Sequence, residues 1–373
     1  MRILIAGGGT GGHLYPGIAL ARELLRRNPS AQVSFVGTAQ GLEARVVPRE
    51  GFELDMIRVA GLKGKGRAER LRGLLLLPSA AIDAWRVISR RRPEVVVGVG
   101  GFASGPVLAL AAVRGYPTML LEQNALPGLT NRLLARFVRA AAVNFEDALS
   151  YFPRTGFVAG NPVRTEFFPA RNEEANDHTS KPFDVAQGEP LNAARVLIFG
   201  GSQGAHAINV AMVEAAARLA ATGLQLAITH QTGERDLDLV RTAYHRAGLA
   251  ARVEAFLFEM DGEMKAADLV ICRAGATTLA ELTASGRPAI LVPLPTATDD
   301  HQRKNAEVLA RAGAGLVIEE RDLSGERLAG TIAQLVADPA RRRQMSEAAR
   351  QLARPDAAAR IADRVEQLGQ GKQ

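Results

Sequence analysis

The chain opens with Arg2-Ile3-Leu4-Ile5-Ala6-Gly7-Gly8-Gly9-Thr10-Gly11-Gly12-His13, an apolar run followed by a glycine-rich turn and the start of a helix. A second copy of this pattern begins at Arg195 and continues through Gly200-Gly201-Ser202-Gln203-Gly204-Ala205. In such a unit, free backbone N–H groups and the positive end of the helix dipole face an incoming anion, and glycine lets it approach closely. Two units predict two similar domains with a cleft between them, one half of which binds a nucleotide diphosphate.

The pattern of the whole chain predicts an α/β protein. Its 373 residues are too many for one ordinary core, so two domains are expected. Short β-branched runs alternate with helical stretches, as in parallel sheets covered by helices. Only the polar segment 170–194 breaks this alternation and is interpreted as a loop or disordered insert. We expect two doubly wound domains with ligands beyond the carboxyl ends of the strands. The predicted elements include helices at 16–27, 127–138 and 340–368, the last broken near Pro355, and a strand at 252–257.

The net charge of +7 and pI of about 10.0 favour anionic partners such as nucleic acid, an acidic membrane surface or phosphorylated substrates. Aromatic residues make up only 5% of the chain and are not interleaved with basic ones, which argues against nucleic acid. The single cysteine, Cys272, allows no internal disulfide and no cysteine-based zinc site. Asp236-Leu237-Asp238 resembles a metal-binding pair but falls on a predicted charged helix, so it is assigned to solvated surface and no metal is expected.

The first glycine turn also fits the dinucleotide motif G-x-G-x-x-G at Gly7, Gly9 and Gly12. A nicotinamide-binding domain needs an acidic residue at the end of the second strand, and the first acid there is Glu43, so this interpretation is disfavoured. His13 follows the turn at a helix N-terminus, where the dipole lowers an imidazole pKa and keeps the ring available as a base. A capping or packing role is the alternative for His13.

Polar side chains follow several other predicted strands. Glu122-Gln123-Asn124 lies where hydrogen bonds could recognise a sugar, and Arg164 could bind a diphosphate bidentately or form an interdomain ion pair. Glu281, about one turn into a helix, could accept both hydroxyls of a ribose or lie exposed on the helix face. Asp299-Asp300-His301-Gln302 could reach a bound sugar or cap a helix.

A basic and amphipathic stretch covers residues 63–92. Basic residues from Lys63 to Arg72 precede Leu74-Leu75-Leu76-Leu77, and Trp85 and the basic residues Arg86 to Arg92 follow. Cations beside an apolar face with a tryptophan are typical of docking onto an anionic bilayer. The alternative is a core helix with solvated ends.

In combination, these motifs resemble the family of bacterial N-acetylglucosaminyltransferases that convert lipid I to lipid II, the MurG family. The resemblance covers nearly the whole chain apart from residues 170–194. It rests on the opening glycine turn with His13, Glu122-Gln123-Asn124, Gly128-Leu129-Thr130-Asn131, Gly160-Asn161-Pro162-Val163-Arg164, the turn at Gly200, Cys272-Arg273-Ala274-Gly275-Ala276, Glu281, Gln302 and Asn305.

The resemblance implies a GT-B fold, with two Rossmann-like domains facing a cleft. Residues 1–163 would form the acceptor-binding, membrane-facing domain, residues 164–354 the UDP-sugar domain, and a helix at 355–373 would cross back. It implies inverting transfer of N-acetylglucosamine from UDP-N-acetylglucosamine to the C4 hydroxyl of the muramyl sugar on an undecaprenyl diphosphate carrier, in peptidoglycan synthesis. The enzyme would need no cofactor or metal and would bind peripherally at the cytoplasmic face of the inner membrane.

The resemblance also implies roles by position. Thr10, Gly11 and Gly12 would contact the donor, Asn124 would bind the donor sugar, and Arg164 and Ser202 would bind the diphosphate. Leu257 would contact the uracil, Glu281 would bind the ribose and Gln302 would bind the N-acetylglucosamine. The helix start would be lined by Ala276, Thr277, Thr278, Leu279 and Ala280, and the general base would be His13. The chain departs from the family at Leu257, where an isoleucine is usual, and at His301, where a second glutamine is usual.

Three alternatives remain besides the nicotinamide enzyme. Another GT-B enzyme, either a UDP-sugar 2-epimerase or a glycolipid glycosyltransferase, would share the fold. The basic apolar stretch argues against the epimerase, whose substrate is fully soluble. A non-catalytic sugar-nucleotide-binding subunit would need a partner chain, whereas both half-sites occur in this one.

Overall fold

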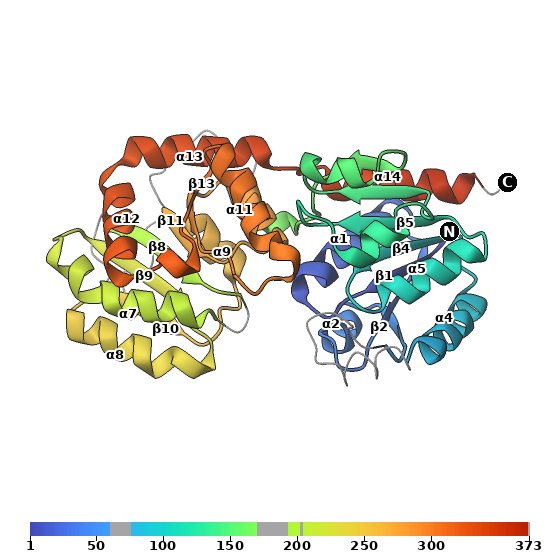
Figure 1. Cartoon of the computed structure of the whole chain (residues 1–373), viewed down its shortest axis with the longest axis horizontal. Helices are drawn as coiled ribbons and strands as arrows, with labels where there is room; N and C mark the ends of the chain where they lie inside the picture. The colour runs from blue at the N-terminus through green and yellow to red at the C-terminus, as the bar shows by residue number, and fades with distance from the viewer. Residues whose placement is uncertain (60–75, 170–192, 202–203, 372–373) are drawn as a thin grey trace. The chain divides into compact units, whose positions relative to one another are not determined.

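The computed structural model describes residues 1–59, 76–169, 193–201 and 204–371. They form two units, Met1–Arg164 together with Arg354–Gln373, and Thr165–Ala353 (Figure 1). Arg164 and Arg354, which the sequence placed in the second domain, both belong to the first unit. The basic residues from Lys63 to Arg72, Ser202 and all but the end of the predicted insert lie outside the described residues.

The N-terminal unit contains a parallel sheet with the strand order β3-β2-β1-β4-β5-β6-β7. Its described strands are β1 (Arg2–Gly7), β2 (Gln32–Gly37), β3 (Glu53–Met56), β4 (Val95–Gly100), β5 (Thr118–Glu122), β6 (Ala140–Val143) and β7 (Gly156–Val158). Its described helices are α1 (Gly11–Arg27), α2 (Glu43–Arg49), α4 (Leu77–Arg91), α5 (Ser104–Val113), α6 (Leu129–Leu134), the 3₁₀ helix η1 (Glu146–Tyr151) and α14 (Ala357–Gln370).

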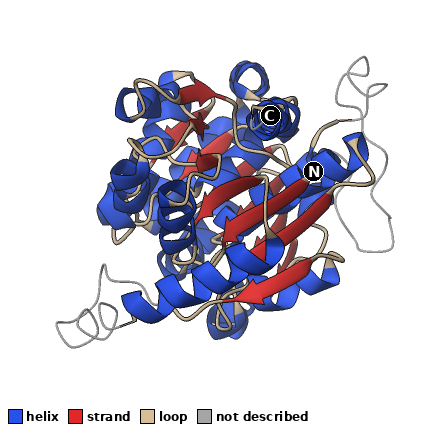
Figure 2. Cartoon of the chain, turned by 90° about the vertical axis from the view of Figure 1, so that its right-hand side faces the viewer, coloured by secondary structure: helices blue, strands red, loops and turns tan. Residues whose placement is uncertain are grey.

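Helices cover both faces of this sheet (Figure 2). Successive side chains of β1 point to opposite faces, as in any strand. Ile3 and Ile5 therefore join a buried cluster with apolar residues of α1 and α14, while Leu4 joins residues of α4 and α5 on the other face. Burial on both faces explains the nearly continuous apolar run that opens the chain.

The last helix, α14, packs on the N-terminal unit although it is distant in sequence (Figure 1). Ile361 and Val365 enter the same core cluster as β1. Arg27 at the end of α1 forms ion pairs with Asp363 at 2.5 Å and with Glu366 at 3.4 Å. The C-terminus therefore completes the core of the first unit.

The C-terminal unit repeats the arrangement, with the strand order β10-β9-β8-β11-β12-β13. Its described strands are β8 (Ala194–Phe199), β9 (Leu226–Gln231), β10 (Ala251–Glu254), β11 (Leu269–Cys272), β12 (Ala289–Leu291) and β13 (Gly315–Val317). Its described helices are α7 (His206–Ala221), α8 (Leu237–Ala247), α9 (Met260–Ala266), α10 (Ala276–Ser285), α11 (His301–Arg311), α12 (Gly325–Ala337) and α13 (Pro339–Leu352), with 3₁₀ turns η2 (Thr165–Phe167), η4 (Glu234–Asp236), η5 (Thr298–Asp300) and η6 (Glu320–Asp322).

Several predicted boundaries are wrong. Helix α1 begins at Gly11 rather than at residue 16, with Thr10 as its extended N-cap, so His13 lies in its first turn. The predicted helix 127–138 shortens to α6, and the predicted strand 252–257 ends at Glu254. The short helix α9 was not predicted. No helix among the described residues is long and apolar enough to cross a membrane.

Candidate functional site

The strand order locates the candidate site in each unit. It reverses between β1 and β4 in one sheet and between β8 and β11 in the other. In open α/β sheets, ligands bind beyond the carboxyl ends of the strands at this reversal. The turns after β1, β4 and β8 are rich in glycine, and the turn after β11 contains Ala274 and Gly275. The turns after β1 and β8 are therefore placed where the sequence predicted them.

In the N-terminal unit, the two glycine turns touch each other. The Gly8 N–H donates a 3.1 Å hydrogen bond to the Gly100 carbonyl. A Cβ on Gly101, whose φ is +80°, would lie 2.1 Å from the Gly8 carbonyl oxygen, and one on Gly7 would lie 2.3 Å from that of Gly100. Glycine is required because no side chain fits between the two turns.

His13 lies beside this contact. Its Nδ1 is 3.1 Å from the Thr10 hydroxyl oxygen, and a Cβ on Gly100 would come within 2.3 Å of its Cδ2. The imidazole therefore rests on the backbone of the β4 turn, held at the N-terminus of α1. Gly11 and Gly12 form the first turn of the same helix.

Glu43 also stabilises the glycine turn after β1. Its carboxylate is buried and accepts hydrogen bonds from the Gly9 N–H at 2.6 Å, the Thr38 N–H at 2.8 Å and the Thr38 hydroxyl at 2.9 Å. A Cβ on Gly8 or on Gly41 would strike it. Sequence reasoning used Glu43 only as evidence against a nicotinamide site and missed this contact. The glycines around the acid were the available signal.

In the segment Glu122-Gln123-Asn124, the first two side chains form hydrogen bonds within the N-terminal unit. Glu122 is buried and accepts hydrogen bonds from the Asn124 and Gly128 N–H groups and from the Asn131 amide. Burial raises the pKa of its carboxyl. Gln123 is also buried and donates to a backbone carbonyl of β4. Only Asn124 remains half-buried at the end of β5, so the prediction that Glu122 and Gln123 recognise a sugar is wrong.

Arg164 belongs to the N-terminal unit. Its guanidinium carbon lies 5.6 Å from the centre of the Tyr15 ring on α1, within range of a cation–π interaction. This contact places Arg164 over the helix that begins with the first glycine turn.

In the C-terminal unit, the turn after β8 rests on the end of β9. The Gly204 N–H donates to the Gly201 carbonyl at 2.9 Å. A Cβ on Gly204 would lie 1.8 Å from the Thr232 carbonyl oxygen. This turn therefore has the same requirement for glycine as its counterpart.

A polar network that is buried except for His206 lies next to this turn. Asp236 is buried and accepts hydrogen bonds from His206 Nδ1 at 3.0 Å and from the Asn209 amide at 2.8 Å. The Asn209 carbonyl oxygen faces His230 Nε2 at 3.0 Å, so Nε2 carries the proton and Nδ1 accepts from the Tyr244 hydroxyl at 2.8 Å. The assignment of Asp236 to solvated surface is therefore wrong.

The start of α10 has an exposed and a buried side. Ala276 and Leu279 are buried, while Thr277, Thr278, Ala280 and Glu281 are partly exposed. The side chains of Ala276 and Leu279 therefore face the core, and only the other four residues present theirs to solvent. Burial raises the pKa of the Cys272 thiol on β11, and the nearby negative charge of Glu281 raises it further. Arg273, just before the turn, is committed to an ion pair with Glu320 at 2.5 Å.

The loop before α11 is strained. Asp299 and Asp300 have φ values of +56° and +57°, which costs energy for residues other than glycine. His301 Nδ1 donates to the Thr298 carbonyl at 2.6 Å, so His301 stabilises the turn. Gln302 accepts a hydrogen bond from the Leu294 N–H at 3.0 Å.

Leu257 lies in the loop after β10. It is buried, and its N–H donates to the Gln231 side-chain oxygen at 2.8 Å. Its neighbours Phe256 and Phe258 are exposed and pack edge to face with ring centroids 5.0 Å apart. The loop therefore presents aromatic side chains to solvent around a fixed backbone.

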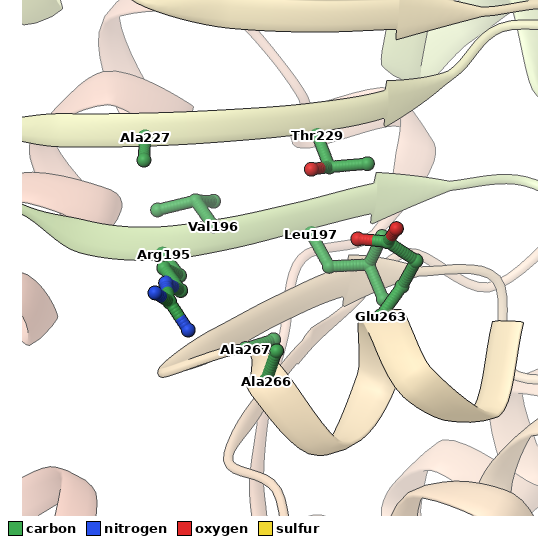
Figure 3. A pocket seen from close by; sticks show the side chains of 8 residues that line it. All are labelled: Arg195, Val196, Leu197, Ala227, Thr229, Glu263, Ala266 and Ala267. Carbon is green, nitrogen blue, oxygen red and sulfur yellow. The ribbon is translucent and has the colours of Figure 1, made fainter. Parts of the chain in front are cut away.

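A small pocket lies elsewhere in this unit (Figure 3). Arg195 and Ala227 line it from the amino-terminal halves of β8 and β9, and Glu263 of α9 lies beside Leu197. None of the predicted site residues lines it. No group of three or more histidine, cysteine or acidic side chains in the described ranges could hold a metal ion.

Helix α4 presents an apolar and basic surface, here called the α4 surface. Ile82 and Trp85 are each about half exposed, at 51% and 52%, and Arg86 is exposed beside them. The guanidinium of Arg114 stacks 4.1 Å from the Trp85 ring. In the described part of the predicted stretch, these apolar and basic side chains are therefore exposed, while membrane docking stays a prediction.

Fewer of the basic residues of α4 are available than predicted. Arg90 and Arg91 both form ion pairs with Asp55, and Arg91 also pairs with Glu53. These pairs fasten the end of α4 to β3. They leave less positive charge for an external partner than the sequence suggested.

Both halves of the chain match one glycosyltransferase family. The N-terminal domain of glycosyltransferase family 28 matches residues 3–143, and the C-terminal domain matches residues 195–361. The chain belongs to glycosyltransferase family 28. Its two Rossmann-like units are the halves of a GT-B fold, as the resemblance implied.

Individual family 28 relatives are similar over nearly their whole length. The chain is 50% identical to a protein of Anaeromyxobacter sp. strain K over 97% of this chain and 92% of that one. It is 47% identical to a Myxococcus xanthus protein with the same coverage. Both relatives are named UDP-N-acetylglucosamine–N-acetylmuramyl-(pentapeptide) pyrophosphoryl-undecaprenol N-acetylglucosamine transferase.

The fold is also similar to those of solved structures. Acinetobacter baumannii MurG superposes with a TM-score of 0.78 at 29% identity, covering 98% of this chain and 99% of that one. A UDP-N-acetylglucosamine 2-epimerase of Listeria monocytogenes superposes with a TM-score of 0.71 at 14% identity, covering 100% of this chain and 97% of that one, and shows only the shared fold. The resemblance to the MurG family is therefore confirmed.

Proposed function

We propose that this protein transfers N-acetylglucosamine from UDP-N-acetylglucosamine to the C4 hydroxyl of the muramyl sugar on an undecaprenyl-diphosphate-linked acceptor, with inversion at the anomeric carbon. The observation that carries the proposal is the near-full-length similarity to relatives named for this transfer. The glycine turns at both strand-order reversals support it, because each can accommodate an anion at a helix N-terminus.

The donor is assigned mainly to the C-terminal unit. The Leu257 segment would contact the uracil, Glu281 the ribose hydroxyls and Gln302 the N-acetylglucosamine. The partly exposed positions of Glu281 and Gln302, on the helices after β11 and β12, support these roles. Thr277, Thr278 and Ala280 would line the same helix start, with Ala276 and Leu279 contributing only backbone.

The N-terminal unit would supply most of the remaining groups. Its Arg164 would bind the diphosphate together with Ser202 of the C-terminal unit. Asn124 would contact the donor sugar, and Thr10, Gly11 and Gly12 would also contact the donor.

His13 is the proposed general base. When its Nδ1–H donates to the Thr10 hydroxyl, Nε2 carries the lone pair that accepts the C4 hydroxyl proton. The C4 oxygen then bonds to the anomeric carbon as the bond to the UDP oxygen breaks. The electron pair leaves with UDP, whose added charge Arg164 and the helix N-termini would stabilise.

Peripheral docking on the anionic cytoplasmic face of the inner membrane would bring the enzyme to its lipid-linked acceptor. The exposed Ile82 and Trp85 of the α4 surface, with Arg86 beside them, support this part of the proposal. Apolar side chains combined with cations are suited to the boundary between headgroups and acyl chains.

A turnover experiment tests the activity. UDP-N-acetylglucosamine is supplied with and without a lipid I analogue, and both UDP and the sugar nucleotides are quantified. We expect stoichiometric UDP and a disaccharide product only when the acceptor is present. Conversion of the sugar nucleotide without acceptor would indicate an epimerase, and UDP binding without turnover would indicate a binding subunit.

A further inference from the structure

The side chain of Gln231 joins two segments of the C-terminal unit. Gln231 ends β9, which lies between β8 and β10 in the sheet, and only 2% of its surface is exposed. Its Nε2 donates to the Gly201 carbonyl after β8 at 2.8 Å. Its Oε1 accepts from the Leu257 N–H after β10, also at 2.8 Å. One amide therefore bridges the loops on both sides of its own strand.

The two partners require an amide. The Gly201 carbonyl needs a donor and the Leu257 N–H needs an acceptor, and a neutral amide offers both from one planar group. A glutamate carboxylate of nearly the same shape offers acceptors only, and a leucine offers neither. A glutamate would place a carboxylate oxygen against the Gly201 carbonyl, which would keep only its hydrogen bond from the Gly204 N–H. A leucine would in addition leave the N–H of the buried Leu257 without its acceptor, which is costly.

The rest of the β9 end is fixed independently of this side chain. The Thr232 carbonyl accepts from the Asn209 amide at 2.9 Å and packs against Gly204. The Gly233 N–H donates to the Ala255 carbonyl at 3.1 Å. Backbone contacts thus hold the surrounding loops, and Gln231 adds a direct link between Gly201 and Leu257.

We infer that Gln231 is a positioning residue that sets the spacing between the uracil-binding segment at Leu257 and the diphosphate-binding turn at Gly201. The inference rests on the proposed function, which assigns those two segments to the donor. With the spacing fixed in advance, a nucleoside diphosphate engages both segments at once. Gln231 touches no substrate itself and acts through the two backbone groups it holds.

Two variants separate the two ends of the bridge. Gln231→Glu keeps the acceptor for Leu257 and removes the donor to Gly201, whereas Gln231→Leu removes both. Gln334→Glu is the matched control, since Gln334 is exposed on α12. Calorimetric titration gives the Kd of uridine and of UDP for each variant, and steady-state kinetics give KM and kcat for UDP-N-acetylglucosamine.

In Gln231→Glu, we expect the Kd of UDP to rise about tenfold while that of uridine changes less than about threefold, because only the diphosphate end has lost its support. In Gln231→Leu, both Kd values should rise. KM for the donor should rise with the Kd of UDP, and kcat should fall less. The control should behave as wild type.

An unchanged Kd of UDP in both variants would overturn the inference. Equal weakening of uridine and UDP in Gln231→Glu would also overturn it, since that pattern indicates a general packing defect. Thermal unfolding checks that each variant is folded, and Gln231→Leu, which buries no charge, carries the test if Gln231→Glu does not fold. Wild-type protein that binds no UDP would instead refute the proposed function.

Discussion

The Gly9 N–H donates a 2.6 Å hydrogen bond to the buried carboxylate of Glu43. The same carboxylate accepts two hydrogen bonds from Thr38, so it ties the turn after β1 to the turn after β2. His13 lies four residues after Gly9, in the first turn of α1. The position of the proposed base therefore depends on an acid that contacts no substrate.

Replacement of Glu43 should impair catalysis more than it weakens nucleotide binding. Glu43→Gln places an amide donor against the Gly9 N–H and removes a charge-assisted hydrogen bond, a loss of about 1.5–3 kcal/mol. We expect kcat to fall roughly tenfold or more, while the Kd of UDP rises less, because the C-terminal unit supplies most of the proposed donor contacts. Glu50→Gln, at the end of the same helix in a partly exposed pair with Arg22, is the control. Wild-type kcat in Glu43→Gln would contradict this role.

Removal of the imidazole tests the general base. His13→Ala should lower kcat by about 10²–10⁴-fold, the usual contribution of a positioned base. Its effect on donor affinity should be far smaller because the backbone of the turn remains. The acidic limb of the pH–rate profile, which protonation of a catalytic imidazole produces, should disappear. A mutant that keeps wild-type turnover and that limb would exclude His13.

Loss of the Glu281 carboxylate should weaken the donor through its ribose. Glu281→Ala removes an acceptor for hydroxyl hydrogen bonds, so UDP binding should lose about 1.5–3 kcal/mol. The 2′,3′-dideoxy analogue of UDP lacks those hydroxyls and should bind wild type and variant alike. Equal UDP affinities of the two proteins, measured by calorimetry, would refute the assignment.

The buried His230 should make the C-terminal unit sensitive to acid. Burial lowers the pKa of His230 to about 3, whereas an unfolded histidine titrates near 6.5. Between these values the unfolded chain binds more protons, so the stability that the neutral ring contributes is complete above about pH 6.5 and declines as the pH falls towards 3. From pH 7.5 to 5.5 the free energy of unfolding should drop by about 1.4 kcal/mol through this residue.

The variant His230→Gln should lack that drop, because glutamine does not titrate. Urea unfolding followed by circular dichroism measures it, and the fluorescence of Trp85, the chain's single tryptophan, reports the N-terminal unit separately. His245→Gln, at an exposed position of α8, is the control. An identical pH dependence in His230→Gln and wild type would show that His230 is not the group responsible.

The α4 surface should govern membrane binding. Joint replacement of Ile82 and Trp85 by glutamine removes two apolar side chains that are each about half exposed. Binding to anionic phosphatidylglycerol vesicles should therefore weaken roughly tenfold. Binding of the wild type should also weaken as salt rises. Leu239→Gln, at a similarly exposed position of α8, is the control. Co-sedimentation that is equal for the double variant and wild type would move docking to another surface.

The sequence was sufficient for the features that depend on local pattern. The glycine turns at Gly7 and Gly200 predicted both sheets, because strand, turn and helix are adjacent in the chain. The position of His13 at a helix N-terminus follows from the same pattern. The MurG resemblance added the family, which no single motif could establish.

Contacts between distant segments could not be predicted in this way. The environments of Glu43, Gln231 and Asp236 depend on which strands become neighbours and in which register. Sequence therefore treated Asp236 as solvated, although Asn209 and His206 enclose it. Glu122 appeared to be available for a ligand for the same reason, although the turn that follows it uses both of its carboxylate oxygens.

The structure of the reaction product tests the central claim most directly. The protein is incubated with UDP-N-acetylglucosamine labelled with carbon-13 in the sugar and a lipid I analogue, and the purified product is studied by NMR. The account predicts one labelled N-acetylglucosamine per acceptor, β-linked to C4 of the muramyl sugar. An α-linked product, attachment at another hydroxyl, or labelled sugar nucleotide converted without any glycoside would contradict it.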